Sequence, residues 1–224
     1  STPLGPERGR RGPVADWVTI SALATAGGTL ALAAATFGSV RSANRAARVA
    51  EESLLAGIRP LLVSSRVDDP SQKIGFADDH WLVVAGSCAA LEATPEAIYL
   101  AGSVRNAASG LAVLHGWRFQ PDLTDAASSA APPVEDFHRL TRDIYVPAGD
   151  LGYWQGTFRD PTAAEFGPAA TAITARSQVL VDVLYGDQYG GQRVVSRFAL
   201  MPREDGAWLT TAARHWQLDR PDPR

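Results

Sequence analysis

The stretch WVTISALATAGGTLALAAATFGSV, Trp17–Val40, contains no charged residue and no proline over 24 positions. A helix rises about 1.5 Å per residue and the hydrocarbon core of a bilayer is about 30 Å thick, so roughly 20 mostly apolar residues span it. The stretch has that length, although alanine, glycine, serine and threonine make it only moderately apolar. We therefore predict a transmembrane helix over residues 17–40.

The residues on either side of this stretch have different compositions. Residues 1–16 are rich in proline, glycine and arginine and predict a flexible tail. Residues 41–58 contain strong helix formers and no proline, and Gly57 followed by Pro60 ends the pattern, so we expect a helical extension. Two alternatives stay open: a cleaved twin-arginine export signal beginning at Arg10-Arg11, and a buried helix of a soluble protein.

Two faces of the expected helix carry candidate interaction residues. Small side chains recur every fourth residue, a spacing that lets helix backbones approach closely in lipid: Gly27, Ala31, Ala35 and Ser39. This face favours association with other membrane subunits or with a second copy of the chain, and a plain abundance of alanine and glycine is the alternative. Basic side chains recur beyond the apolar stretch: Arg41, Arg45 and Arg48. They favour contact with anionic lipid headgroups, and a solvated helix face is the alternative.

From Pro60 onward the periodicity changes from that of helices to that of strands. QVLVDVLY (178–185) alternates apolar residues on one face, and RVVSRFAL (193–200) and AWLTTAARHW (207–216) follow after turn sequences. Three consecutive strands joined by tight turns predict an antiparallel meander. With the earlier strands of the chain, we predict a mainly-β, antiparallel, β-sandwich-like domain over residues 59–224. The polar stretches 68–79 and 122–136 are predicted as surface loops.

A longer pattern in the chain resembles known proteins. It consists of IRPLL (58–62), LAGSVRNAASGLAVLHGW (100–117), QRVVSRFAL (192–200) and RHWQLDRPDPR (214–224). It is similar to uncharacterised actinobacterial single-pass membrane proteins, whose strand-turn-strand core reads R-N-x-G-x-G-x-A. Arg105-Asn106 and Gly110 match that core, whereas Ala108 replaces its inner glycine. The resemblance implies an N-terminal membrane helix, a helical extension and a β-rich domain, and it implies no activity.

Residues with the potential for catalysis or metal binding are scattered. His80, His115, His138 and His215 show no metal-binding spacing. The acidic loop with Asp68, Asp69, Asp78, Asp79 and His80 lacks the residue order of a calcium loop, so we interpret its charges as solvated. Cys88 is the only cysteine and lies in an apolar stretch, which favours a buried small side chain. We expect no catalysis, no metal and no cofactor. A net charge of −3 indicates no nucleic-acid partner.

The aromatic residues divide into two groups. Tryptophans on predicted strands, or at the ends of such strands, are expected to fill the core: Trp117, Trp154, Trp208 and Trp216. Trp81 and Tyr189 lie closer to loops and are candidate contact residues if they are exposed, since these residue types concentrate at interfaces. Partial burial against the sheet is the alternative for both.

Taken together, these patterns predict a single-pass protein of the cell membrane that acts as an accessory or binding protein. Its expected partners are the lipid bilayer and other membrane-protein subunits or itself. A membrane-tethered, hydrolase-like enzyme with a site of scattered histidine and aspartate is one alternative, and an exported soluble binding protein is another. Arg41, Arg45, Arg48 and Arg59 outnumber Arg8, Arg10 and Arg11 by one arginine, which favours a cytoplasmic β domain; the opposite orientation stays open.

Overall fold

One long helix precedes the strands. The computed structural model describes residues 14–124 and 128–219, with side chains from residue 17 onward. Helix α1 covers Val14–Gly57, 44 residues, and is therefore about 66 Å long. It begins three residues before Trp17, so residues 14–16 are helical and not part of a flexible tail; residues 1–13 lie outside the described part. Its end at Gly57 agrees with the predicted helical extension.

Helix α1 is a candidate membrane span by its length and composition. Large apolar side chains remain exposed along it, including Trp17 at 72% and Phe37 at 70%. The hydroxyl groups of Ser21, Thr25, Thr29 and Thr36 donate hydrogen bonds to backbone carbonyls three or four residues earlier, at 2.8–2.9 Å. These bonds satisfy the polar groups within the helix, as a hydrocarbon environment requires. The helix is long and apolar enough to cross a membrane.

The chain divides into two compact units, residues 1–53 and residues 54–224. The second unit includes the last turn of α1, and this turn is bonded to the β domain. Gln192 Nε2 donates a hydrogen bond of 2.6 Å to the carbonyl oxygen of Leu55. Arg59 Nε donates to Gln192 Oε1 at 2.8 Å. The side chain of Gln192 therefore links the end of the helix to the segment that leads into the first strand.

The predicted meander is confirmed. Strands β9 (Val179–Gly186), β10 (Arg193–Pro202) and β11 (Trp208–Gln217) follow one another and pair antiparallel. Val195 of β10 lies between Leu184 of β9 and Trp216 of β11. Short turns rich in glycine and aspartate join the strands, as the sequence indicates, because such residues adopt turn conformations at little cost.

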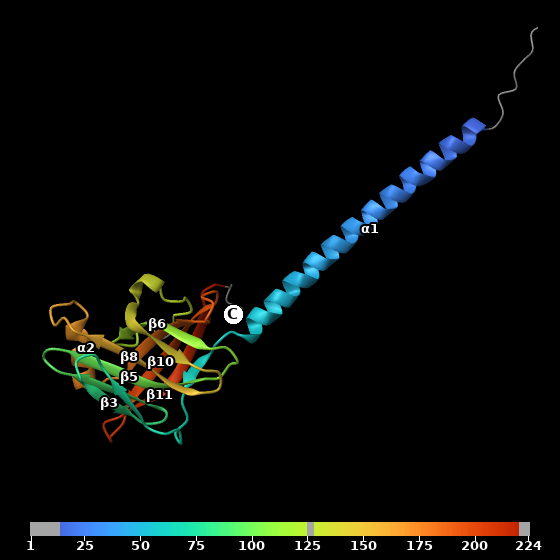
Figure 1. The fold of residues 1–224 in the computed structure, drawn as a ribbon. Helices are drawn as coiled ribbons and strands as arrows, with labels where there is room; N and C mark the ends of the chain where they lie inside the picture. Colours follow the sequence, from blue (N-terminus) through green and yellow to red (C-terminus); the bar gives the residue numbers. More distant parts are fainter. Residues whose placement is uncertain (1–13, 125–127, 220–224) are drawn as a thin grey trace, which may run out of the picture. The chain divides into compact units, whose positions relative to one another are not determined.

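The meander belongs to one nine-stranded sheet with the order β1-β5-β4-β11-β10-β9-β6-β7, and β8 pairs with β5. The remaining strands are β1 (Leu62–Ser64), β4 (Cys88–Ala93), β5 (Ile98–Asn106), β6 (Ala112–Gln120), β7 (His138–Val146) and β8 (Leu151–Phe158). Strand β8 pairs with the edge of β5 opposite to β1, and it contacts β7, which ends the order on the other side and precedes β8 in the chain. The sheet is therefore curled, and its two halves face each other across the core as in a sandwich (Figure 1). A mainly-β antiparallel domain after one long helix is confirmed.

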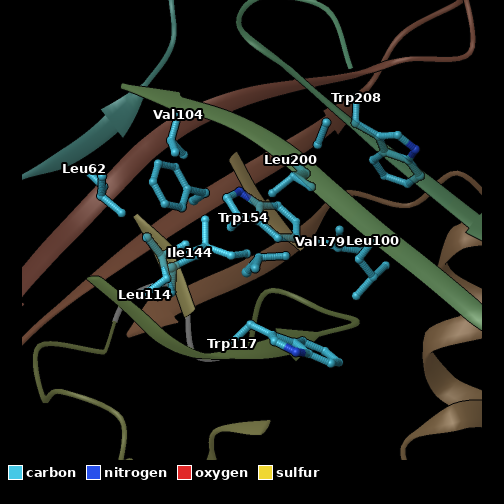
Figure 2. Packing of buried hydrophobic residues seen from close by; sticks show 14 of the residues in the cluster. Leu62, Leu100, Val104, Leu114, Trp117, Ile144, Trp154, Val179, Leu200 and Trp208 are labelled. Carbon is cyan, nitrogen blue, oxygen red and sulfur yellow. The ribbon is translucent and has the colours of Figure 1, made fainter. Parts of the chain in front are cut away.

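The core lies inside the curl of the sheet. Trp117, Trp154 and Trp208 are at most 3% exposed within it, as predicted (Figure 2). Two glycines make room for these rings: a Cβ atom on Gly102 would lie 2.5 Å from the Trp154 ring, and one on Gly156 would lie 2.5 Å from Trp117. Helix α2 (Phe166–Thr174), which the sequence analysis did not predict, buries Phe166, Ala169, Ala172 and Ile173 in the same core.

A two-stranded ribbon covers part of the outer face of the sheet. Strands β2 (Gln72–Gly75) and β3 (Trp81–Val84) pair antiparallel. Ile74, Leu82 and Val84 pack against the outward side chains Tyr99 and Ala101 of β5. The prediction of a surface loop over residues 68–79 is therefore wrong for residues 72–75, which form a strand. Residues 122–136 contain only a 3₁₀ turn, Val134–Asp136, in their described part.

Candidate interaction surfaces

The outward face of the β2–β3 ribbon exposes large apolar side chains. Along β3 the exposure alternates: Trp81 is 51% exposed and Val83 66%, whereas Leu82 and Val84 are buried. A strand that covers a sheet buries one face in this way, and the other face normally carries polar residues. Here the outer face carries tryptophan and valine. Trp81, one of the two predicted contact residues, is therefore exposed on regular structure.

The indole of Trp81 is held in place by its neighbours on β2. Gly75 lies opposite Trp81 in the ribbon, and a Cβ atom on Gly75 would lie 2.7 Å from the indole ring. The ammonium group of Lys73 lies 4.7 Å from the centre of the same ring, a cation–π contact. Arg142 fixes the ribbon to the sheet by donating hydrogen bonds to Gly75 O at 3.1 Å and to Gln155 Oε1 at 3.0 Å. We call Lys73, Gly75, Trp81 and Val83 the ribbon face.

Three members of the ribbon face are not among the residues that the sequence predicts: Lys73, Gly75 and Val83. Lys73 and Gly75 lie in the stretch whose composition predicts an acidic loop. Exposed and buried residues alternate in WLVV (81–84), which pairs with QKIG (72–75). The sequence gives little sign of this pairing, because aspartates precede β2, lie between β2 and β3, and dominate the composition of the stretch.

The acidic loop itself is held by hydrogen bonds and ion pairs. Asp69 forms an ion pair with Arg105 and accepts a bond from the backbone N–H of Arg66 at 2.7 Å. Asp78 accepts hydrogen bonds from Tyr99 Oη at 2.6 Å and from Arg159 at 2.7 Å. These donors, Tyr99 first, lower the pKa of Asp78 below its ordinary value. Within the described residues, no cluster of three or more metal-binding side chains occurs.

Tyr189, the second predicted contact residue, is 73% exposed at the tip of the β9–β10 turn. The carboxylate of Asp187 holds this turn by accepting hydrogen bonds from the backbone N–H groups of Tyr189 at 2.8 Å and Gly191 at 3.2 Å. The structure does not bring Tyr189 and Trp81 together: one lies on a turn, and the other lies on the ribbon that packs against β5.

One histidine meets a carboxylate beside a polar cleft. His138 Nε2 lies 2.8 Å from Glu165 Oε2, and the imidazole stacks on Trp117 at 4.5 Å between ring centres. The cleft has a volume of about 490 Å³ and is also lined by Arg118 and Asp136. A histidine that meets a carboxylate is what the alternative of a membrane-tethered enzyme predicts. The structure brings these groups together, although the sequence places them far apart.

The other candidate groups for catalysis are buried or structural. His215 Nδ1 lies 2.7 Å from Ser196 Oγ, but Ser196 is fully buried and also contacts the hydroxyl of Tyr185 at 2.8 Å. The hydroxyl of Tyr185 accepts a hydrogen bond of 3.0 Å from the backbone N–H of Leu62. Burial lowers the pKa of His115 and raises that of Cys88, so both favour their neutral forms.

A buried ion network lies on the outer face of the meander. Asp182 is fully buried and accepts hydrogen bonds from Arg197 Nε at 2.7 Å and Nη2 at 2.8 Å. Arg118 lies 3.3 Å from the same carboxylate. The guanidinium of Arg197 lies 4.9 Å from the ring centre of Trp216, which donates a hydrogen bond to Ser129 O at 2.9 Å. The segment before β7 thus covers these charges.

The two predicted faces of α1 are exposed on the helix. The small-residue face, Gly27, Ala31, Ala35 and Ser39, is exposed, and a Cβ atom on Gly27 would have no neighbour within 4 Å. The basic face carries Arg41, Arg45 and Arg48, which line a shallow groove of about 410 Å³ together with Phe37, Val40 and Asn44. Both faces are therefore available for contacts with lipid or protein.

Comparisons with known proteins do not add to this description. Neither a scan of protein-family models nor a search of curated proteins found a match to the chain.

Proposed function

We propose that the chain is a membrane-anchored accessory protein whose β domain binds a protein partner through the ribbon face, without catalysis of its own. The observation that carries this proposal is the exposed, ordered indole of Trp81 beside the exposed Val83. Tryptophan is enriched among the few residues that dominate binding energy at protein interfaces. A partner that covers this face would remove both apolar side chains from water.

The order of the Trp81 side chain supports a binding role. Immobilising a side chain on association costs about 0.5–1.5 kcal/mol, and a side chain that is already held avoids much of this cost. Gly75 beneath the ring and Lys73 beside it hold the indole before any partner arrives. The absence of a side chain at Gly75 leaves room for the indole to lie across the neighbouring strand.

The anchor in this proposal is α1 as a single membrane span at the cell membrane. Its exposed apolar side chains and back-bonded hydroxyls support it. Alkaline carbonate extraction should leave the protein in the membrane pellet. Release of a mature form that starts near Thr36 would instead favour the alternative of an exported soluble binding protein.

The proposed partner interaction is tested by copurification from native detergent through a tag after Arg224. Trp81→Ala should weaken capture of the partner by about 30-fold in affinity, the equivalent of about 2 kcal/mol for a dominant interface residue. Tyr145→Ala is the matched control because Tyr145 is an aromatic residue of similar exposure, 55%, that lies on β7 and is not part of the ribbon face. Equal copurification by wild type and both variants would refute the role of the ribbon face.

A second candidate function, a membrane-tethered hydrolase, is favoured by the pair His138–Glu165 beside a polar cleft. A carboxylate that orients an imidazole suits it to act as a general base on water. The test is hydrolysis of chromogenic esters and phosphoesters by the purified protein. Activity that disappears in His138→Gln and Glu165→Gln would establish the hydrolase. Activity that both variants retain, or no activity, would leave the accessory role.

The proposed orientation places the β domain in the cytoplasm. The support is the position of Arg41 next to the apolar stretch, followed by Arg45 and Arg48. External protease should spare the β domain in intact spheroplasts and digest it after lysis. Digestion before lysis would reverse the orientation.

A further inference from the structure

We propose that the basic face of α1 is a binding site for the headgroups of anionic phospholipids. The site consists of Arg41, Asn44, Arg45 and Arg48, with Phe37 and Val40 at its apolar end. This inference rests on the proposed anchoring of α1 in a membrane. It adds a preference between classes of lipid, which anchoring by an apolar segment alone does not produce.

Arg41, Arg45 and Arg48 form no ion pair with a carboxylate of residues 17–53. Several guanidinium groups of the β domain do pair with carboxylates, as Arg105 does with Asp69 and Arg193 with Asp219. Three cationic groups on one helix face repel one another, so an anionic ligand relieves a cost that the chain itself leaves in place.

The polar side chains of the site are arranged along one face of the helix. Arg41, Arg45 and Arg48 follow one another at spacings of four and three residues, and Asn44 lies between them on the same face. Their groove has a volume of about 410 Å³. Guanidinium groups donate paired hydrogen bonds to phosphate oxygens, and the amide of Asn44 adds a further donor. This donor set matches a phosphate diester with an additional polar headgroup.

Apolar residues are followed by basic residues along this face of α1. Phe37 and Val40 are 70% and 53% exposed and end the apolar stretch, and the arginines begin at the next residue. A phospholipid has the same order, because its acyl chains adjoin its phosphate. A free phosphate would use the arginines and leave the apolar end of the groove without a ligand. Glu52 lies four residues beyond Arg48 on the same side of the helix and ends the basic face, at the end away from the apolar stretch.

The experiment compares the lipids that the full-length protein retains. The protein is incubated in mild detergent with equal amounts of phosphatidylglycerol and phosphatidylcholine, purified again, and its bound lipids are quantified. Wild type should enrich phosphatidylglycerol over phosphatidylcholine. Each arginine replaced by glutamine should reduce the ratio up to about fivefold, the equivalent of about 1 kcal/mol per basic residue near an anionic surface. The triple variant Arg41→Gln, Arg45→Gln, Arg48→Gln should retain both lipids equally.

The matched control removes the same charge from the β domain, in the variant Arg66→Gln, Arg139→Gln, Arg203→Gln. It should enrich phosphatidylglycerol as wild type does, and a loss in this control equal to that in the helix variant would overturn the site in favour of net charge. Inorganic phosphate is tested against chloride at equal ionic strength. Loss of enrichment with phosphate alone would show a free-anion site and refute the lipid site.

Failure of this inference can be distinguished from failure of the anchor. If carbonate extraction retains wild type in the membrane while wild type and the helix variant keep equal lipid ratios, the headgroup site is refuted and the anchor stands. If carbonate extraction releases wild type, the anchor itself is refuted and the headgroup site is refuted with it.

Discussion

Replacing Asp182 with asparagine should destabilise the β domain strongly. The substitution keeps the shape of the side chain and removes its charge, and Arg197, which is 2% exposed, then remains buried without its charged acceptor. Removing one partner of a buried ion pair costs about 3–5 kcal/mol, because the other charge cannot regain its hydration. The proximity of Arg118 to the same carboxylate places the expected loss in the free energy of unfolding in the upper part of this range.

The assay is urea unfolding of the full-length protein in mild detergent, followed by tryptophan fluorescence. Asp205→Asn provides the matched control. Asp205 lies 3.2 Å from Arg203 in a pair whose side chains are about half exposed, and such pairs contribute about 0–1 kcal/mol. If Asp182→Asn lowers the free energy of unfolding by no more than Asp205→Asn, the buried network does not hold the sheet as argued.

Three further predictions concern a buried hydroxyl group, an ion-paired carboxylate and the small-residue face of α1. Tyr185→Phe removes the acceptor of a buried backbone N–H and should lower the free energy of unfolding by about 1–3 kcal/mol, whereas Tyr145→Phe on the surface should change it by less than about 0.5 kcal/mol. Arg105 donates a hydrogen bond to the carboxylate of Asp69 and lowers the pKa of Asp69. The ionised carboxylate therefore contributes its full stabilisation above the ordinary pKa of 3.8, and this stabilisation is lost as the pH falls through the lowered value. The stability difference between wild type and Asp69→Asn should therefore shrink on acidification; a difference that grows would contradict the sign. Replacing Gly27 and Ala31 with leucine should abolish copurification of membrane partners without preventing insertion, and unchanged copurification would show that this face reflects composition only.

The helix and the meander could be predicted because each carries one strong local signal. Uninterrupted apolar residues determine the core of α1, and the alternation from Val179 to Tyr185 places one face of β9 inward. The outer face of β9 was less accessible to prediction. The alternation along β9 predicts that Asp182 is exposed. In the structure Asp182 is fully buried, because the segment before β7 covers it and Arg197 neutralises its charge. Burial by a segment that is distant in the sequence leaves no periodic signal in the strand itself.

The ribbon face shows a second limit of prediction. Strands β2 and β3 have four residues each, and over so few residues an alternating pattern cannot be distinguished from chance. Trp81 could be named from its residue type, but its exposure depends on the pairing with β2 and on packing against β5. The cleft beside His138 likewise depends on α2, which carries no strong helical signal of its own. These features follow from tertiary contacts.

The cation that lies beside Trp81 has a practical consequence, because Lys73 is the only lysine among the 224 residues. Reagents that acylate amines therefore find one lysine side chain in this sequence, and it is in direct contact with the exposed indole. The rate of acylation at Lys73 reports whether the ribbon face is covered, without any substitution in the protein. A bifunctional amine reagent would, for the same reason, attach a bound neighbour to the chain at this single point.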